Sequence, residues 1–502
     1  MLTFEFFDCL LPQPPRTFVW HDIGNGLAIA RQDDRLALLH AAGEIGEPFL
    51  GVFYGDCIHT FYIPDFRRRR HCLAKPYLGN FERRHKKDPT VPTAPLHFDP
   101  TDPAVRADPF PLFARLRAED PVHWSPMFKG WIVTRYSDVQ AVLNGPQMSA
   151  DRITPFYTAL PGQMQERVKE LVQLLGQWLV FRDPPDHTRL RSVMMKPFTP
   201  KAMAAIRPNI EGIVDLLLDN LAKKDEADIV ADFTTPLPAY VIMDMLGVPR
   251  DMFTAMKAWS DDIRLFIGTA RGVPNKYEKA QHGLREMSAW FRKLIAERRV
   301  EPRNDVLTAL VQARDESTAE KGPLSDDELV AACILFLFGG HETTTNLLGN
   351  ASLMLMRHPE EKRRFLADPA LTAPAVEEFL RYDGPSFSMV RIVAAEHELA
   401  GRTLAKGDRI FAIQNSANRD AAEFADPDRF DIARTPNRHV TFGYGLHFCI
   451  GAPLARMEAQ IALPRLHQRY PEMKLAIDEP TWIDSMVMRG TTALPVRLGR
   501  KA

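Results

Sequence analysis

Cys449 lies in the stretch FGYGLHFCIG, where three glycines, two phenylalanines and a histidine surround one cysteine. Glycine weakens regular structure unless a position needs a positive φ or another group must approach the backbone closely. The stretch therefore predicts a tight loop of specific shape. The next residues, APLARMEAQIAL, carry Pro453 near a first turn and apolar residues at helical spacing. We expect Cys449 at the turn that opens this helix, where backbone N–H groups and the helix dipole favour a thiolate.

Four uses compete for such a cysteine: a buried structural residue, a disulfide partner, a zinc ligand, or a lone nucleophile or metal ligand. The chain has 502 residues and five cysteines without paired spacing, which argues against a disulfide framework and a zinc half-site. One thiolate cannot complete a tetrahedral zinc site, but it can be the axial ligand of haem iron. A cysteine protease stays open because His447 is near in sequence, although catalytic pairs normally meet through the fold.

Charge and hydropathy exclude several classes of protein. The net charge of −1 leaves no overall electrostatic attraction for nucleic acid or acidic membranes. No apolar run approaches the roughly 18 residues of a membrane span. The first residues, MLTFEFFDCLLPQPP, have acids where a secretory signal needs basic residues. We expect a cytoplasmic monomer that binds neither nucleic acid nor membrane.

The composition changes near residue 90, and we place a boundary near Thr93. Residues 66–88 are strongly basic without sustained periodicity, and a proline-rich linker follows. A solvated or disordered tail is the favoured interpretation of the basic run, ahead of a binding arm. A true start downstream is a third alternative. Residues 1–94 are thus expected to be an extension of unknown role, and residues 95–502 the main domain.

Regular patterns begin at Pro109. PFPLFARLRAED predicts a short helix, and VHW and WIVTRY predict a β-hairpin. Long helical patterns such as GIVDLLLDNLAKK follow, and strand patterns return only in short pieces such as ALPVRLG. The predicted fold class is mainly α with small β-sheets.

A long helix is predicted from the Ser325–Glu328 capping box to about Arg357. Inside it, FGGHETTTN is a poor helix interior, since glycine and β-branched residues both lower helix propensity. Thr343 is placed to hydrogen-bond the carbonyl of Gly339, and the missing glycine side chains leave room beside the backbone. Glu342 in this apolar helix is either a buried acid with a raised pKa or an ion-pair partner.

Three further segments carry charged groups at helical or strand spacing. Glu378 and Arg381 are three residues apart on one helical face, which alone indicates an ordinary ion pair. His187 and Arg191 are four apart on a helix expected after Pro185, and SMVRIV contains Arg391. Arginine and histidine suit the binding of carboxylates, although each alone is more often an ordinary surface residue.

FGYGLHFCIG resembles the haem-binding signature of the cytochrome P450 family, Phe-x-x-Gly-x-His-x-Cys-x-Gly, at every fixed position. The resemblance implies that Cys449 is the proximal iron ligand of haem b, that Phe442 shields the sulfur, and that the backbone near Gly451 approaches it. His447 would hydrogen-bond a haem propionate. The expected fold places the haem between the long helix and the helix after Cys449.

FGGHETTTN resembles the family's Ala/Gly-Gly-x-Asp/Glu-Thr motif. By that resemblance Glu342 and Thr343 direct protons to iron-bound dioxygen, and Gly339 adjoins the cofactor. The other charged segments also match family elements. His187, Arg191 and Arg391 would bind the propionates, and a buried structural trio would consist of Glu378, Arg381 and Arg429.

The resemblance covers roughly residues 96–498 and implies a bacterial-type haem-thiolate monooxygenase. It would use O₂ and two electrons from a separate ferredoxin or flavodoxin with its NAD(P)H reductase to hydroxylate or epoxidise an apolar small molecule. The alternatives are a peroxide-using or rearranging member of the family, and a protein of another class: a catalytically silent haem sensor or ligand-binding protein, or a factor that works through the basic run at residues 66–88. Arg438 and Arg456 are candidates for the docking of the electron donor. By family position, the substrate pocket would draw on residues 153–160, 336–340, 385–390 and 486–488.

One residue departs from the expected pattern. Pro464 falls inside the predicted helix after Cys449, so this helix is expected to kink or end early.

Overall fold

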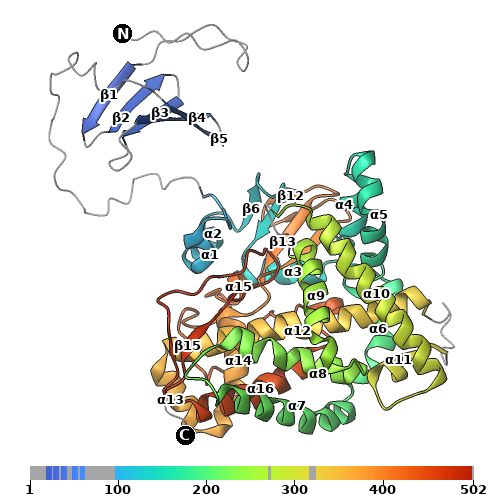
Figure 1. Ribbon diagram of the computed structural model, residues 1–502. Helices are drawn as coiled ribbons and strands as arrows, with labels where there is room; N and C mark the ends of the chain where they lie inside the picture. The colour runs from blue at the N-terminus through green and yellow to red at the C-terminus, as the bar shows by residue number, and fades with distance from the viewer. Residues whose placement is uncertain are drawn as a thin grey trace. The chain divides into compact units, whose positions relative to one another are not determined.

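The computed structural model describes residues 96–268, 273–315 and 324–499, and five strands nearer the N-terminus. The chain divides into two compact units, Met1–Pro92 and Thr93–Ala502 (Figure 1). The basic run at 66–88 and the linker that follows it lie outside the described residues.

The first unit contains an antiparallel sheet that sequence reasoning did not predict. Each strand pairs with the next along the chain, in the order β1-β2-β3-β4-β5. The strands are β1 (Val19–Gly24), β2 (Leu27–Gln32), β3 (Arg35–Ala41), β4 (Pro48–Tyr54) and β5 (Cys57–Tyr62). The role assigned to residues 1–94 stays a prediction.

The second unit is built around the long helix α12 (Asp326–Arg357), which runs through the middle of the helical region in Figure 1. Ser325 and Glu328 form the predicted capping box at its start. Twenty-three residues of α12 are buried, so both its faces pack against other elements and tertiary packing offsets its weak helix formers. Its neighbours are α8 (Pro236–Leu246), α10 (Lys276–Val300), α14 (Thr372–Asp383) and α16 (Ala452–Arg469).

The remaining described helices complete the helical layer. They are α1 (Pro103–Ala107), α2 (Phe110–Glu119), α3 (Tyr136–Asn144), α4 (Ile153–Thr158), α5 (Gly162–Leu175), α6 (Asp186–Met194), α7 (Pro200–Leu221), α9 (Phe253–Ile267), α11 (Val306–Asp315), α13 (Pro359–Ala367) and α15 (Gln414–Ala417).

Small sheets lie beside these helices, as predicted. The largest has the order β6-β7-β13-β10-β8, in which the predicted hairpin of β6 and β7 is antiparallel. Its strands are β6 (Val122–Ser125), β7 (Gly130–Val133), β8 (Met148–Ser149), β10 (Ser388–Val393) and β13 (Arg409–Ile413). A pair is formed by β11 (His397–Leu399) and β12 (Arg402–Leu404), and a third sheet by β14 (Lys474–Leu475), β15 (Pro495–Arg497) and β9 (Glu226–Asp228). The predicted mainly α class with small sheets is confirmed.

Helix α16 corrects the expectation of an early end. It continues through Pro464 to Arg469. Proline removes one backbone hydrogen bond, but the neighbouring Leu463 and Leu466 are fully buried, and α16 packs against α7 and α12. Among the described helices, none is both long enough and apolar enough to cross a bilayer.

Candidate active site

The loop before α16 has the tight shape that its glycines predict. Gly443 and Gly445 have φ values of +78° and +72°, which L-residues with a side chain rarely adopt. A Cβ at Gly445 would also collide with the side chain of Asn144. The N–H of Cys449 donates a hydrogen bond to the carbonyl of Phe442 at 2.9 Å, and α16 begins three residues later. Cys449 therefore lies at the turn that opens the helix, as predicted.

The Cys449 thiol is accessible to solvent although protein surrounds it closely. Burial raises the pKa of this thiol, while the N–H groups of Gly451 and Ala452 and the charges of Arg191 and Arg456 act in the opposite direction. The N–H groups at the start of the helix thus favour the thiolate as expected, but burial has the larger effect on this pKa. Coordination to a metal ion deprotonates a thiol outright. A Cβ at Gly451 would lie 3.9 Å from the sulfur, so this backbone does approach it closely.

Four basic side chains meet beside this loop, on α6, on β10 and on the short helix η7 (Gly445–His447). The rings of His187 and His447 lie 4.1 Å apart, centroid to centroid. His187 is fully buried, and neither of its nitrogens has a hydrogen-bond partner in the described part of the chain. Arg391 is also buried, and its Nη2 is likewise unpartnered. Arg191 donates to the carbonyl of Phe448 at 2.7 Å and so ties α6 to the Cys449 loop.

The electrostatics of this cluster favour an anion. Burial, followed by the charges of Arg391, His187 and Arg191, lowers the pKa of His447 to about 3. Burial lowers the pKa of Arg391 to about 10, and Asp183 offsets only part of that effect. Buried donors with unmet hydrogen bonds are costly, so the cluster is suited to a ligand with several carboxylate oxygens.

Arg152 is a further cation at this place that sequence reasoning missed. Its guanidinium lies 4.8 Å from the ring centroid of Phe181, and burial and the charge of Arg391 lower its pKa to about 10. The pairing of β8 with β10 carries Arg152 toward Arg391, because Ser149 lies opposite Ile392. Such cross-strand proximity leaves no local signal in the sequence. A cleft of about 510 Å³ is lined by His187 and Arg191 together with Asn144, Thr188, Ser192, Met195, Gly445 and Leu446.

Helix α12 shows the predicted local geometry at Thr343. Its hydroxyl donates to the carbonyl of Gly339 at 2.9 Å. A Cβ at Gly339 would meet nothing within 4 Å, whereas one at Gly340 would press on Ile242 of α8 at 3.0 Å. Gly339 therefore opens the helix toward free space, and Gly340 permits close packing of two helices.

Glu342 is buried and paired, so the ion-pair alternative holds. His341 Nε2 lies 3.2 Å from Oε1, Lys257 Nζ lies 3.7 Å from Oε1, and Arg264 Nε lies 3.6 Å from Oε2. Burial alone raises the pKa of Glu342, but the contact with His341 and the charges of His341, Lys257 and Arg264 outweigh it and lower this pKa to about 2. The two cations on α9 were not predicted. Their spacing of seven residues places them on one helical face, but only the fold shows that this face meets α12.

The comparisons with known proteins decide the family. The cytochrome P450 family matches residues 159–488. The chain is 36% identical over 417 residues to the polyketide biosynthesis cytochrome P450 PksS of Bacillus subtilis, which covers 81% of this chain and 99% of that protein. It is 37% identical to the cytochrome P450 monooxygenase PikC of Streptomyces venezuelae, covering 78% of this chain and 92% of PikC. The chain belongs to the cytochrome P450 family.

A solved P450 structure agrees with the fold. The complex of P450BioI with a hexadec-9Z-enoic acid ligated acyl carrier protein matches with a TM-score of 0.72 at 32% identity. The match covers 79% of this chain and 99% of that one. The protein is a P450 monooxygenase, and its cofactor is haem b.

The residues of this chain fit haem. The unpartnered nitrogens of His187 and Arg391 are the donors that two propionates require, and Gly339 leaves space on α12. Cys449 is the one thiol that faces this region, since Cys333, the other cysteine among the residues whose side chains are described, is fully buried in the core. The individual roles of Cys449, His187, Arg191, Arg391, His447 and Phe442 stay proposals.

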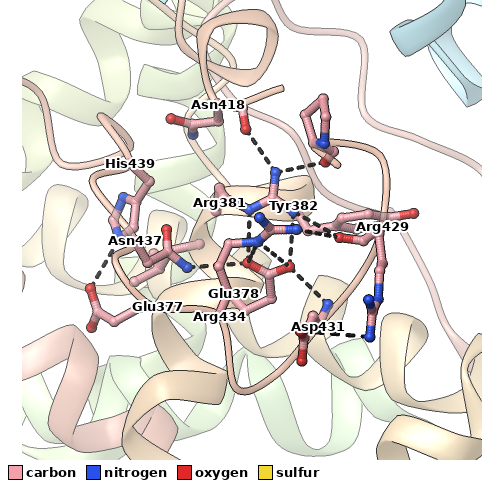
Figure 2. A network of polar contacts seen from close by, with 12 residues as sticks. Glu377, Glu378, Arg381, Tyr382, Asn418, Arg429, Asp431, Arg434, Asn437 and His439 are labelled. Atoms are coloured by element: carbon pink, nitrogen blue, oxygen red, sulfur yellow. Dashed lines mark hydrogen bonds and ion pairs between the residues drawn. The ribbon is translucent and has the colours of Figure 1, made fainter. Parts of the chain in front are cut away.

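The scaffold beside the Cys449 loop contains a buried charge network, shown in Figure 2. Arg381 donates from Nε and Nη2 to both carboxylate oxygens of Glu378, at 2.7 and 2.8 Å, and both side chains are inaccessible to solvent. The carboxylate also accepts hydrogen bonds from the backbone N–H of Asp431 and from Asn437. The pair is thus fully hydrogen-bonded, which a buried ion pair requires.

The predicted third member of this network was wrong. The Arg429 side chain is 65% exposed and lies 3.9 Å from Asp431, so only its backbone carbonyl joins the network, where it accepts from Arg381. The second arginine on Glu378 is Arg434, whose Nε lies 3.3 Å from Oε2 (Figure 2). The chain turns between these two residues, and the turn directs Arg434 inward and Arg429 to solvent.

A second network lies directly beneath the Cys449 loop. Arg456 donates two hydrogen bonds to Glu377, at 2.7 and 2.8 Å, and its guanidinium lies 4.6 Å from the ring centroid of Phe442. His439 contacts the same carboxylate at 3.0 Å. Arg456 therefore supports the loop from within through Glu377 and Phe442.

Proposed function

We propose that this P450 uses O₂ and two externally supplied electrons to hydroxylate or epoxidise an apolar small molecule. The observation that carries the proposal is the acid and alcohol on α12, where Glu342 is held by charged partners and Thr343 is bonded to the open turn at Gly339. A P450 that only used peroxide or rearranged its substrate would have no need to retain this pair.

Each residue has a separate task in this proposal. When bound, the haem iron supplies the reduction of O₂ and the oxygen transfer, with Cys449 as its protein ligand. Thr343 keeps its hydrogen on the carbonyl of Gly339, so its oxygen lone pairs face the open side and can accept a hydrogen bond from a water. Glu342 connects this position with Lys257 and Arg264, which are 28% and 29% exposed. Protons can thus reach a buried site from solvent through groups of this chain.

We infer an apolar substrate from the segments assigned to the pocket. Residues 385–390 and 486–488 lie side by side, since the N–H of Phe387 donates to the carbonyl of Val487 and Ser386 pairs with Met488. Phe387, Val390 and Met486 belong to one buried apolar cluster. Ile153 and Phe336 are buried in the largest cluster. The names of PksS and of the P450BioI complex refer to a polyketide and a fatty acid, and a compound with a long aliphatic part would suit such a lining.

The electron donor is proposed to be a separate ferredoxin or flavodoxin with an NAD(P)H reductase. The exposed side chains around Cys449 include Tyr444, Leu446 and Phe448, an apolar surface that a partner can cover. Arg438, beside this surface, is 73% exposed, whereas the guanidinium of Arg456 is already hydrogen-bonded to Glu377. We therefore assign the attraction of the donor to Arg438 rather than to Arg456.

The test begins with the reduced carbon monoxide difference spectrum, which reports thiolate ligation of haem iron. The wild-type protein should give the thiolate band, and Cys449→Ala should lose it. NADH consumption with surrogate redox partners and a library of apolar compounds should then give oxygenated products. Product from hydrogen peroxide alone would favour the peroxide-using alternative, and binding without product under either condition would favour a silent sensor.

A further inference from the structure

His341 lies next to Glu342 on α12 and has no role in the function proposed above. Its side chain is buried, at 3% exposure. The Nδ1 atom lies 2.6 Å from the carbonyl oxygen of Leu337, one turn earlier. A carbonyl can only accept, so Nδ1 carries a hydrogen in this arrangement. Any exchange of a proton must then take place at Nε2.

Nε2 of His341 lies beside the acid. It is 3.2 Å from Oε1 of Glu342, close enough for an ion pair and for a hydrogen bond after a small rotation of the ring, and neither atom has a hydrogen-bond partner in the described part of the chain. Most buried polar atoms are hydrogen-bonded, so an unpartnered nitrogen at this distance from a carboxylate calls for an explanation.

The groups around Glu342 would allow its carboxylate to take up and release a proton. From α9, Lys257 and Arg264 face the carboxylate, and Asp261 contacts both cations from the same helix. From α8, the residue that presses on the adjacent turn of α12 is the apolar Ile242. Glu342 thus lies between a partly exposed charged group on α9 and a buried imidazole on its own helix.

We propose that His341 is a positioning residue that holds an exchangeable proton for Glu342 at Nε2. The inference rests on the proposed function of Glu342 and goes beyond it, because it assigns the proton store to a side chain outside the acid–alcohol pair. It also explains why the acid is buried next to a histidine that is anchored to Leu337.

The proton balance is simple. The exchange begins from an imidazole with hydrogens on both nitrogens and a Glu342 carboxylate. The Nε2 proton moves to Oε1, which leaves a neutral imidazole with its hydrogen on Nδ1 and a neutral carboxylic acid. Glu342 then releases this proton toward the Thr343 side, and a proton from solvent, entering beside Lys257 and Arg264, restores Nε2. No electrons move in these steps.

Two variants separate the parts of the proposal. His341→Gln places an amide donor near Glu342 but cannot exchange a proton, and His341→Asn retains a donor for the Leu337 carbonyl but does not reach Glu342. Glu342→Gln identifies the infrared band of the Glu342 carboxyl group. The haem-loaded protein is used throughout, and its absorption spectrum shows whether each variant has folded and bound haem.

The first measurement is infrared spectroscopy of Glu342 between pH 5 and pH 8. We expect a carboxylate in the wild type across this range, and a protonated carboxyl band in both His341 variants at the acidic end. The second is the ratio of product to NADH consumed, which should fall about tenfold with release of peroxide. Turnover driven by hydrogen peroxide, which arrives already reduced and protonated, should change less than twofold.

Unchanged infrared bands together with an unchanged product ratio would overturn the inference. An equal loss of NADH-driven and peroxide-driven turnover would also overturn it, since it would indicate a structural role only. If the wild type shows no oxygenation at all, the proposed function fails. The infrared comparison then decides alone whether His341 controls the protonation of Glu342.

Discussion

The imidazole rings of His187 and His447 lie 4.1 Å apart at the meeting point of α6 and the Cys449 loop, and both nitrogens of His187 lack hydrogen-bond partners among the described residues. An unpaired buried polar group lowers stability unless a ligand satisfies it. Without haem, the unpaired nitrogens of His187 should lower the stability of the protein. With haem bound, they can hydrogen-bond a propionate and so help to retain the cofactor.

The first prediction concerns haem retention. His187→Leu should speed the loss of haem to a scavenging apoprotein by about 10- to 100-fold, because a hydrogen bond to a charged group contributes about 1.5–3 kcal/mol. The same variant should leave the stability of the haem-free protein unchanged or raised. Asp186→Asn, on the same helix and 4.0 Å from Arg182, is the control. Equal haem loss from both variants would remove His187 from the propionate site.

The second prediction concerns the network in Figure 2. Glu378→Gln should destabilise the protein by about 3–5 kcal/mol, because Arg381 is fully buried and would lose its charge partner. Arg434→Ala should also be clearly destabilising, since Arg434 is only 11% exposed and contacts the same carboxylate.

Arg429→Ala is the matched control for this network and should change stability by less than about 0.5 kcal/mol. Its side chain is mostly exposed. Chemical denaturation of the three variants at one pH measures the differences. An Arg429→Ala variant as unstable as Arg434→Ala would contradict the assignment of Arg434 as the buried partner.

The sequence predicted those contacts whose two partners lie within one helical turn. The Ser325–Glu328 capping box, the Thr343 bond to Gly339 and the Glu378–Arg381 pair all follow from helical geometry, which is the same in every protein. The order of these motifs along the chain matches that of the cytochrome P450 family, and this match predicted the surrounding fold.

The contacts that join distant segments could not be predicted in the same way. Whether Arg429 or Arg434 reaches Glu378 depends on the path of a loop, and residue type cannot distinguish two arginines five positions apart. Similarly, Lys257 and Arg264 meet Glu342 only because the fold brings their side chains on α9 within 4 Å of its carboxylate. The sheet β1–β5 was missed although its sequence carries a signal, since Asn25-Gly26 between β1 and β2 and Gly55-Asp56 between β4 and β5 are dipeptides favoured in two-residue hairpin loops.

The third prediction concerns the pH dependence of stability through His467. This residue is fully buried in α16, neither nitrogen has a partner in the described part of the chain, and burial followed by the charge of Lys362 lowers its pKa to about 3. The unfolded chain then binds one more proton than the folded chain between the two pKa values. Stability should therefore fall as the pH decreases below about 6.5.

His467→Gln should remove this contribution, which amounts to about 2 kcal/mol between pH 7 and pH 5. The quantity to compare is the difference in unfolding free energy between the two pH values, because the substitution itself can change stability at both. An identical pH dependence in wild type and variant would show that folding does not lower the pKa of His467.

The fourth prediction concerns electron transfer. Arg438 is 73% exposed and its nearest acid, Glu423, is 3.9 Å away, so its charge remains available to an acidic ferredoxin. Arg438→Glu should slow reduction by a surrogate ferredoxin roughly three- to tenfold at low ionic strength, with a smaller effect at high salt. The control is Arg497→Glu on β15, which is equally exposed at 73% and pairs with Glu226. Stopped-flow reduction at two salt concentrations measures the rates, and equal slowing in both variants would show a general charge effect rather than docking at Arg438.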